Sequence, residues 1–491
     1  MKKLRPIMLV GTGSDVGKSI VNTAICRILL QDGYSPAPYK AQNMSLNSFA
    51  TPDGFEIGRA QAVQAEACRI DCNTDMNPIL LKPSGEKMSQ VVLNGKPIGN
   101  RSAIEYFRDG NNKILEEAAH AAFDKIASQY NPIVLEGAGS ISELNLRHRD
   151  MTNMAMAVYA DAATYLVADI DRGGVFGSVY GSIALLSTEE RAQIEGIIIN
   201  KFRGDITLFE EGRKILHEIT GVPVVGVIPA YKDIYIEEED SVSLACKAKY
   251  AQDGMVNIAV ILLDKMANFT DFSVLERDER VNLFYTNNLL EIDKADIIII
   301  PGSKNTLADL QELKENGVAK AIVAAHRNGK SVIGICGGYQ MMGLRIHDPE
   351  GIEGSIAQLP GLGLLDIETT MTNEKVTTQT TFRYKHYDTD CHGYEIHMGR
   401  ASFGEQVSPL NQTQEGQEGV MSSDRCWGSY IHGILDNPTV IEDILSPYVA
   451  EKREIEEDYA TFKDRQYDLL ADHFREYLDL ETIYKSVTKE K

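Results

Sequence analysis

Short apolar runs alternate with helix-length amphipathic segments through the first half of the chain. The runs that indicate strands are Ile7–Val10, Ile133–Leu135, Tyr165–Ala168, Gly196–Ile199 and Val224–Ile228. After the first of them, Lys18–Leu30 has apolar residues at helical spacing and is followed by Gly33, a typical helix terminator. Strands that are apolar throughout and separated by helices are typical of a parallel sheet covered on both faces. The pattern therefore predicts an α/β domain.

The same alternation begins again after an acidic and polar stretch, Glu237 to about Gly254, which we interpret as a linker. The apolar runs that indicate strands here are Ile258–Leu263, Ile297–Ile300 and Val332–Ile335. The segment Gly363–Arg400 is rich in Thr and Tyr and is expected to form antiparallel strands. From Pro438 onward the chain is charged and helical, and a helix there should pack back onto the body. The residues expected on its apolar stripe are Leu469, Leu470, Phe474, Tyr477 and Leu478.

Composition and charge limit the kinds of partner. The chain has 491 residues, enough for two or three domains, and its hydrophobic and charged fractions of 43% and 24% are those of an ordinary soluble globular protein. The formal net charge of −22 argues against a nucleic-acid or anionic-membrane partner, since both bind basic surfaces. No apolar stretch is long enough to span a membrane, and the apolar run near the N-terminus is too short for a signal peptide. Seven scattered cysteines fit the reducing cytoplasm, which is the expected location.

The segment GTGSDVGKS, residues 11–19, follows the first apolar strand and opens the first helix. In such a phosphate loop, backbone N–H groups and the helix N-terminus face the anion, a Lys reaches the terminal phosphates and the next hydroxyl binds Mg²⁺. The spacing departs from the general pattern, which has a glycine where this chain has Thr12. A strand-end Asn-Lys pair often lies beside a purine base, although it can also be a simple strand exit. The expected ATP contacts are Thr12, Gly13, Gly17, Lys18, Ser19, Asn200 and Lys201.

A magnesium nucleotide also requires carboxylates. Glu136 lies in VLEGAGS directly after a predicted strand, and Asp53 lies in TPDGFEIGRAQ. Ligands of open parallel sheets gather at the carboxyl ends of the strands, which is also where Asp169 and Asp171 lie in VADIDRGG. Each of these carboxylates also has a plain capping or loop interpretation. We select Ser19, Asp53 and Glu136 as the expected metal ligands.

The segment GICGGYQMMG, residues 334–343, places Cys336 directly after a predicted strand. Its glycines permit the sharp strand-to-helix turn of a nucleophile elbow. A lone cysteine is usually an inert small hydrophobe, but these neighbours favour a nucleophile. The base must be a histidine from elsewhere, either His432 in WGSYIHGI or its competitor His397 in YEIHMG. A thiol nucleophile on one chain with a nucleotide site indicates ATP-driven bond formation, and ammonia from glutamine is the leading candidate for the transferred group.

Several of these segments together resemble one family, the cobyric acid synthases. The matching segments, which extend over nearly the whole chain, are GTGSDVGKS, PYKAQNMSLNS (38–48), DGFEIGRAQ (53–61), MNPILLKP (76–83), EGAGS, DRGG and NKFRGD. The resemblance implies an α/β protein with an N-terminal P-loop parallel-sheet domain, similar to dethiobiotin synthetase, and a C-terminal class I glutamine amidotransferase α/β domain. By this resemblance, residues 1–240 form the ATP-dependent amide synthetase domain, 255–445 the glutamine amidotransferase domain and 446–491 a C-terminal helical segment.

The resemblance also implies a substrate and a reaction. The substrate is adenosylcobyrinic acid a,c-diamide, whose b, d, e and g carboxylates are amidated in turn with Mg-ATP and glutamine in cobalamin biosynthesis. A corrin with several carboxylates requires cations and amide donors. The residues of the matching segments expected to bind it are Lys40, Gln42, Asn43, Arg59, Lys82 and Arg172. Each of them has an ordinary structural interpretation as well, and the sequence does not indicate an oligomeric state.

In the amidotransferase half, the resemblance makes Cys336 the nucleophile and His432 its base. The expected oxyanion donors are the backbone N–H groups of Gly302, Ser303 and Gly337. Many relatives have a Glu two residues after the histidine to orient it, whereas this chain has Ile434. A Cys–His pair without the usual third member is therefore expected, with Glu395 as a conceivable orienting residue.

Two other functions stay open at this point. The nearest is the sister reaction, the a,c-diamidation of cobyrinic acid, against which QNMSLNS and DGFEIGRAQ favour the later enzyme. The other is a regulatory ATPase of the partitioning type that carries an idle amidotransferase-like domain. The presence of both Cys336 and His432 argues against idleness, and a plain glutaminase subunit leaves the nucleotide half unexplained.

Overall fold

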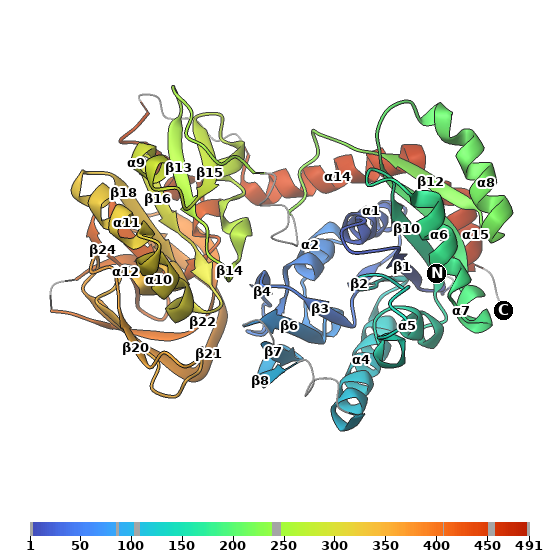
Figure 1. Cartoon of the computed structure of the whole chain (residues 1–491), viewed down its shortest axis with the longest axis horizontal. Coiled ribbons are helices and arrows are strands. Elements are labelled where there is room, and N and C mark those ends of the chain that lie inside the picture. Colours follow the sequence, from blue (N-terminus) through green and yellow to red (C-terminus); the bar gives the residue numbers. More distant parts are fainter. Residues whose placement is uncertain are drawn as a thin grey trace.

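The structure is a computed structural model of the chain, and it describes residues 3–84, 88–102, 109–237, 247–405, 407–449 and 457–488. Residue 240, at which the first domain is expected to end, and much of the expected acidic linker lie outside these ranges. The described residues form two α/β halves that lie side by side, with a group of short strands between them (Figure 1). None of the described helices is long and apolar enough to cross a membrane.

The first half is built on a parallel sheet with the strand order β12-β11-β10-β1-β9-β2. Its strands are β1 (Ile7–Gly11), β2 (Ala37–Tyr39), β9 (Ile133–Glu136), β10 (Ala163–Asp169), β11 (Ile194–Phe202) and β12 (Val224–Pro229). The predicted strands and the parallel arrangement are confirmed. The strands are apolar throughout because helices cover both faces of this sheet.

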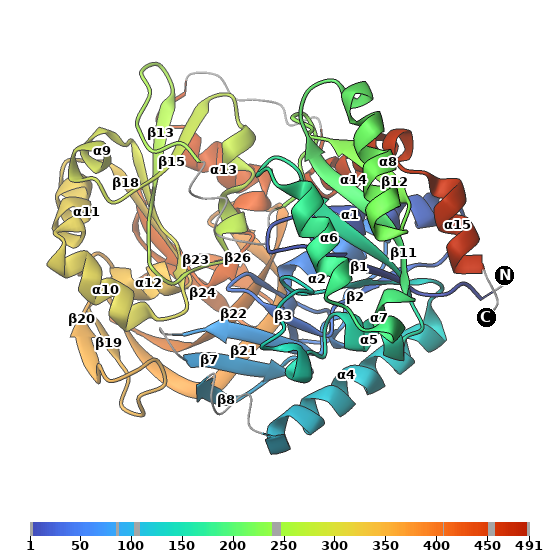
Figure 2. The same ribbon diagram turned by 45° about the vertical axis from the view of Figure 1, so that its right-hand side comes forward.

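Helices from both ends of the chain cover this sheet. The helices on one face are α4 (Asp109–Gln129), α5 (Met154–Tyr159), α6 (Val175–Ala184) and α8 (Glu210–Thr220). The helices on the other face are α1 (Lys18–Gln31), α14 (Tyr459–Tyr477) and α15 (Leu480–Thr488). Figure 2 shows α14 and α15, in red, against the first half and beside α1. The C-terminal helices therefore belong structurally to the first half, although the second half precedes them in the sequence.

Helix α14 packs on a stripe that differs slightly from the predicted one. The residues it buries against the first half are Tyr467, Leu470, Ala471 and Phe474. Leu469, expected on this stripe, is 40% exposed because it lies beside the i, i+3, i+4, i+7 row and not on it. Buried Arg27 of α1 anchors the helix through an ion pair with Asp468, whose Oδ1 lies 2.7 Å from Nε.

The short strands between the halves are not among the predicted elements. They form a sheet with the order β3-β6-β7-β8 and a separate pair, β4 and β5. Their bounds are β3 (Gln42–Met44), β4 (Ser48–Ala50), β5 (Glu56–Gly58), β6 (Ile79–Pro83), β7 (Met88–Leu93) and β8 (Lys96–Ser102). Between β5 and β6 lies α2 (Arg59–Ala67). These elements carry the segments PYKAQNMSLNS, DGFEIGRAQ and MNPILLKP, so much of the sequence that resembles the family lies where the halves meet (Figure 1).

The second half has a mixed sheet. Its parallel strands, in spatial order, are β15 (Val281–Thr286), β13 (Val256–Ile261), β16 (Ile297–Ile300), β18 (Ser331–Ile335) and β25 (Cys426–Ser429). The remaining strands, mostly antiparallel, are β24 (Gln417–Ser423), β23 (Ser408–Thr413), β21 (Ile367–Tyr384), β22 (Asp390–Phe403), β26 (Ile431–His432), β19 (Arg345–His347) and β20 (Gln358–Pro360). The predicted strands and the antiparallel segment are confirmed.

The helices of this half are α9 (Leu289–Lys294), α10 (Thr306–Glu315), α11 (Val318–Arg327), α12 (Gly337–Met342) and α13 (Pro438–Leu445). A separate two-stranded ribbon joins β14 (Met266–Ala267) to β17 (Gly302–Ser303). This ribbon lies at the carboxyl end of β16, where ligands of α/β sheets bind.

Candidate active site

Cys336 lies at the turn between β18 and α12. Its backbone has φ 51° and ψ −107°, a conformation that residues with side chains rarely adopt and that costs about 1–3 kcal/mol. The turn is packed so closely that a Cβ on Gly338 would lie 1.9 Å from the carbonyl oxygen of Ile300. The elbow expected from the glycines is thus present, and the structure holds the thiol at the carboxyl end of a parallel strand.

His432 is the histidine that the structure brings to Cys336. It is 2% exposed, and its Nδ1 lies 2.7 Å from Oδ2 of Asp271. The other oxygen of Asp271 accepts a hydrogen bond from the N–H of Gly433 at 3.0 Å, which fixes the carboxylate. Since Nδ1 is engaged in this way, Nε2 is the nitrogen left to exchange a proton with Cys336, which lines the same small cavity and whose Sγ lies 3.6 Å from the carbonyl oxygen of Ile396.

The charges around His432 favour its protonated form. Burial alone would lower the pKa of His432, but the carboxylate of Asp271 and the sulfur of Cys336 outweigh burial and raise this pKa to about 10. An imidazolium beside the sulfur stabilises the thiolate, which is the nucleophilic form of cysteine. The arrangement can therefore supply a nucleophile, a base and a carboxylate that orients the base.

Asp271 occupies the orienting position that sequence reasoning left to Glu395. Glu395 instead pairs with His397, whose Nε2 lies 3.1 Å from the carboxylate and whose Nδ1 faces a backbone carbonyl oxygen at 2.9 Å. Both nitrogens of the competing histidine are thus occupied. Asp271 lies 161 residues before His432, in the short 3-10 helix η5 (Phe269–Phe272), and no motif in the sequence marks it.

The expected oxyanion donors converge on the Cys–His pair. A Cβ on Gly302 would lie 3.3 Å from Cε1 of His432 and 3.8 Å from Cβ of Cys336, so β17 passes directly beside both. A Cβ on Gly337 would lie 2.7 Å from the backbone nitrogen of Ser303. The three expected donor residues therefore lie close to the Cys–His pair, and their donation to an oxyanion stays a prediction.

A small cavity of about 50 Å³ opens beside Cys336 and His432, and both halves of the chain line it. Lys304 and Lys375 come from the second half, and Lys82 comes from β6 of the first half. We expected Lys82 to bind the corrin, and the structure corrects this placement. Strand β6 directs the ammonium group of Lys82 into the cavity of the thiol, away from the nucleotide loop.

The phosphate loop is held in shape by its own lysine and by the end of β11. Nζ of Lys18 donates hydrogen bonds to the carbonyl oxygens of Gly13 and Gly139 at 3.1 and 3.0 Å. The amide nitrogen of Asn200 donates to a loop carbonyl oxygen at 2.9 Å. Gly17 has φ 93°, and a Cβ there would lie 2.2 Å from that amide nitrogen, so the position requires glycine.

The other expected nucleotide residues lie at the same edge of the sheet. The N–H of Thr12 donates to the carbonyl oxygen of Val167 at 3.1 Å, which ties the loop to β10. Nζ of Lys201 lies 3.0 Å from Oδ2 of Asp169 and also donates to the carbonyl oxygen of Asp15. Lys201, like Asn200, thus fixes the loop, and contacts of either residue with a purine base stay a prediction.

Glu136 is the expected metal ligand that lies at the phosphate loop. It is 1% exposed and accepts hydrogen bonds from Ser19 Oγ at 2.9 Å, Lys40 Nζ at 2.9 Å and Gln64 Nε2 at 2.6 Å. Within the described ranges, no three His, Cys, Asp or Glu side chains gather into a metal-binding group. The oxygens of Ser19 and Glu136 nevertheless fit Mg²⁺, because this ion keeps several waters and takes further ligands from phosphates.

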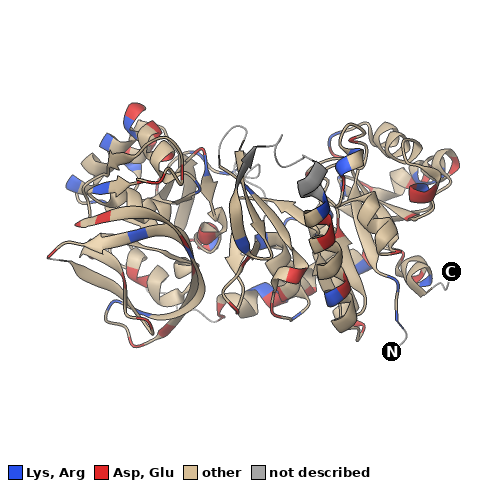
Figure 3. Ribbon diagram, turned by 90° about the horizontal axis from the view of Figure 1, so that it is seen from below, with Lys and Arg blue, Asp and Glu red and all other residues tan. Residues whose placement is uncertain are grey.

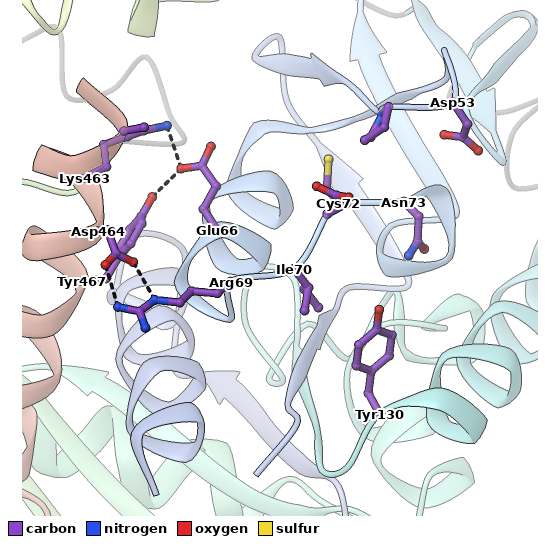
Figure 4. A pocket seen from close by; sticks show the side chains of 13 residues that line it. Asp53, Glu66, Arg69, Ile70, Cys72, Asn73, Tyr130, Lys463, Asp464 and Tyr467 are labelled. Atoms are coloured by element: carbon purple, nitrogen blue, oxygen red, sulfur yellow. Dashed lines mark hydrogen bonds and ion pairs between the residues drawn. The ribbon is translucent and has the colours of Figure 1, made fainter. Parts of the chain in front are cut away.

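Asp53, the other expected metal ligand, is not part of this site. It lies exposed in the turn between β4 and β5 and accepts a hydrogen bond from Thr51 Oγ1 at 2.5 Å. It lines a different cavity of about 770 Å³, and Figure 4 shows it at the opposite edge of that cavity from Lys463 and Tyr467 of α14. Asp53 is therefore removed from the expected set, because a hairpin turn carries it away from the phosphate loop, whereas Ser19 and Glu136 stay the predicted metal ligands.

A cavity of about 830 Å³ extends from the phosphate loop. The expected corrin-binding residues that line it are Lys40, Gln42, Asn43 and Arg172. Arg147 and Arg149 also line it, although no motif marks them. Arg59 does not, because its buried guanidinium is paired with Glu237, at 2.7 Å from Nε to Oε2, and its expected role is corrected to a structural one. Figure 3 shows Lys and Arg interspersed with Asp and Glu over the ribbon, so an anionic substrate depends on local groups of cations such as this one.

Known proteins match the whole chain. Residues 7–244 match the family model described as CobQ/CobB/MinD/ParA nucleotide binding domain, and residues 257–440 match the CobB/CobQ-like glutamine amidotransferase domain. A cobyric acid synthase of Bacteroides fragilis is 61% identical over 99% of this chain and 99% of its own length. Cobyric acid synthases of Phocaeicola vulgatus and Parabacteroides distasonis are each 60% identical, over 99% of this chain and 98% and 99% of their own lengths.

Proposed function

The chain belongs to the cobyric acid synthase family, and on this premise we propose that it amidates the b, d, e and g carboxylates of adenosylcobyrinic acid a,c-diamide in cobalamin biosynthesis. It is a ligase that forms C–N bonds with glutamine as the nitrogen donor. The observation that carries the proposal is the Cys336–His432–Asp271 group on the same chain as a preformed phosphate loop. An idle amidotransferase domain would have no need of this arrangement. The names of the relatives favour this reaction over the a,c-diamidation.

Glutamine hydrolysis would take place at Cys336. The thiolate attacks the carboxamide carbon of glutamine, and the backbone N–H groups of Gly302, Ser303 and Gly337 hold the oxyanion of the tetrahedral intermediate. His432 then gives its proton to the leaving nitrogen, which departs as ammonia and leaves a thioester on the sulfur. Water, deprotonated by His432, hydrolyses the thioester to glutamate and restores the thiolate. Asp271 holds His432 in the tautomer and orientation that both proton transfers require.

Carboxylate activation would take place at the phosphate loop. A corrin carboxylate oxygen attacks the γ-phosphorus of ATP, which gives an acyl phosphate and ADP, and ammonia then displaces phosphate to form the amide. Lys18 stabilises charge on the transferred phosphoryl group. Mg²⁺ bound with the nucleotide would be held by Ser19 and Glu136, and it supplies charge compensation at the phosphates.

The corrin would lie in the larger cavity. Its carboxylates are matched there by Lys40 and Arg172 and by the additional cations Arg147 and Arg149, while Gln42 and Asn43 supply amide groups. Because the reaction consumes ATP and glutamine, we place the protein in the cytoplasm.

Mass spectrometry of adenosylcobyrinic acid a,c-diamide incubated with the protein, Mg-ATP and glutamine tests this function. Each amidation replaces an OH by NH₂, and products amidated at all of the b, d, e and g positions are expected. Cys336→Ala should fail with glutamine and work with ammonium, because acyl activation and ammonia release occupy separate sites. If folded wild-type protein leaves the mass of the corrin unchanged, the assignment of the corrin as substrate is refuted.

A further inference from the structure

We propose that the two halves of the chain share the glutamine pocket, and that Lys82 of the first half, with Lys304 and Lys375 of the second, binds the α-carboxylate of glutamine. The proposal deepens the glutaminase function proposed above and rests on it. It assigns a substrate-positioning role to a residue of the synthetase half, and it gives a physical reason why glutamine binding depends on that half.

Three lysines lie where the α-carboxylate of a bound glutamine would be. The cavity beside Cys336 is lined by Lys82, Lys304 and Lys375. Lys82 is 5% exposed, and the side chain of Lys375 is 8% exposed. When the carboxamide of glutamine lies at the sulfur of Cys336, its α-carboxylate must lie elsewhere in the same cavity. The ammonium groups are the partners for an anion there.

The lysines of this cavity share few carboxylates. Fully buried Glu56 lies between two of the lysines, with Oε1 at 2.7 Å from Nζ of Lys82 and Oε2 paired with Lys375. Burial alone would raise the pKa of Glu56, but the two ammonium groups lower it far below its ordinary value. The single carboxylate of Glu56 thus forms ion pairs with two ammonium groups. The ammonium group of Lys304 lines the same cavity, and burial together with Lys82 lowers its pKa against the attraction of Glu353 and Glu56.

Another carboxyl group lies near Lys304 but compensates it only in part. Burial raises the pKa of Glu353 to about 7, so at neutral pH this group is ionised in only part of the molecules. The lysines also lower one another's pKa values. Burial, together with Lys82 and Lys304, lowers the pKa of Lys375 to about 8 against the attraction of Glu56. Three lysines thus share Glu56 and a partly ionised Glu353, and an anionic ligand beside them would relieve the repulsion that lowers the pKa values of Lys304 and Lys375.

The cavity beside Cys336 suits a small ligand. Its volume is about 50 Å³, against about 830 Å³ for the cavity of the phosphate loop, so a corrin or a nucleotide fits the latter far better. Glutamine is the small anion-bearing substrate of the reaction, and its entry requires the lysine side chains to part. Because Lys82 and Ser48 both belong to the first half, the width of this cavity depends on how the two halves sit together.

The first half also holds the loop that leads to Asp271. Ser48 donates its N–H to Oδ1 of Asn268 at 2.9 Å, and the N–H of Phe269 donates to Oδ1 of Asn47 at 3.2 Å. Nζ of Lys82 donates to the hydroxyl of Ser48 at 2.9 Å, which joins this contact to the lysine group. The glutamine pocket and the residue that orients the base are thus supported from the same side.

The experiment measures labelling of Cys336 in the full-length protein by 6-diazo-5-oxo-L-norleucine, a glutamine analogue that keeps the α-carboxylate. Iodoacetamide, small and uncharged, labels the same thiol and reports its reactivity. For Lys82→Met we expect labelling by the analogue to slow by about 10- to 100-fold, because a hydrogen bond to a charged group is lost. Iodoacetamide labelling and ammonium-driven amidation should stay within about twofold of wild type. Lys82→Arg should recover much of the loss, and Lys96→Met, an exposed lysine on the same small sheet, is the matched control.

Several outcomes would overturn the proposal. Equal slowing with both reagents would mean that Lys82 acts on the thiol, and loss of ammonium-driven amidation would return Lys82 to the synthetase reaction. Labelling of Lys82→Met by the analogue at the wild-type rate would also exclude the proposal. If Lys82→Met does not fold, Lys304→Met should show the same selective loss from the other half, and its absence would count against the proposal. Failure of the analogue to label wild-type Cys336 would instead refute the glutaminase function itself.

Discussion

Replacing Asp271 by Asn removes a negative charge beside His432 and keeps the size of the side chain. In the wild type, Asp271 is the strongest of the groups that raise the pKa of His432 to about 10 against the opposing effect of burial. Without that charge, only the sulfur of Cys336 opposes burial. The pKa of His432 should therefore fall well below 10, and the imidazolium that stabilises the thiolate becomes less populated at neutral pH.

The expected loss of glutamine hydrolysis follows from the geometry of this contact. The contact between Nδ1 and the carboxylate is 2.7 Å long and buried, and hydrogen bonds to charged groups contribute about 1.5–3 kcal/mol. The rate of glutamine hydrolysis should therefore fall by about 10- to 150-fold. The pH dependence has a defined sign. A lower pKa of His432 means that its proton is lost at lower pH, so the thiolate loses its partner, and alkylation of Cys336 should require higher pH in the variant.

The assays are glutamate release and the pH profile of iodoacetamide alkylation, followed by intact mass. Asp264→Asn is the matched control, because this aspartate precedes the same loop and its side chain is 66% exposed. Amidation driven by ammonium should be equal in both variants and the wild type, since it bypasses Cys336. Unchanged glutamate release and an unchanged alkylation profile in Asp271→Asn would refute the orienting role.

Three further substitutions test the nucleotide site. Lys18→Met should reduce ATP-dependent amidation by at least about 100-fold with either glutamine or ammonium, because charge on the phosphoryl group loses its partner, and normal phosphate release would contradict this. Glu136→Gln should abolish magnesium-dependent ATP turnover and lower thermal stability, since it removes the carboxylate that pairs with the buried ammonium group of Lys40. Asp53→Asn should leave ATP turnover within about twofold of wild type, and a loss as large as that of Glu136→Gln would restore Asp53 to the metal site.

The parts of the site that could be predicted are those whose residues lie close together in the sequence. The phosphate loop and the elbow each follow an apolar strand and open a helix, so strand, turn and side chain occur within about ten residues. Asp271 could not be predicted in this way. Its role depends on a contact across 161 residues, and the sequence around it, NFTDF, has no periodicity or spacing that indicates chemistry.

The errors at Asp53, Arg59 and Lys82 have a common physical cause. All three lie in segments that resemble the family, and all three belong to the short elements between the halves, which the apolar pattern does not predict. Without those elements the directions of the side chains are unknown. The turn after β4 exposes Asp53, the start of α2 buries Arg59 against Glu237, and β6 turns Lys82 to the thiol.

One segment connects the two cavities, and its length limits how far apart the two reactions can be. Gln42 and Asn43 line the cavity of the phosphate loop, and Ser48 lines that of the thiol. Six residues of extended chain span at most about 20 Å, so the parts of the two cavities that this segment lines lie within roughly that distance of each other. The same Ser48 is hydrogen-bonded to Asn268, at the start of the loop that carries the orienting carboxylate. This segment therefore links the lining of the nucleotide cavity to the loop that carries Asp271, so a shift of residues 42–48 would reach the base of the glutaminase site.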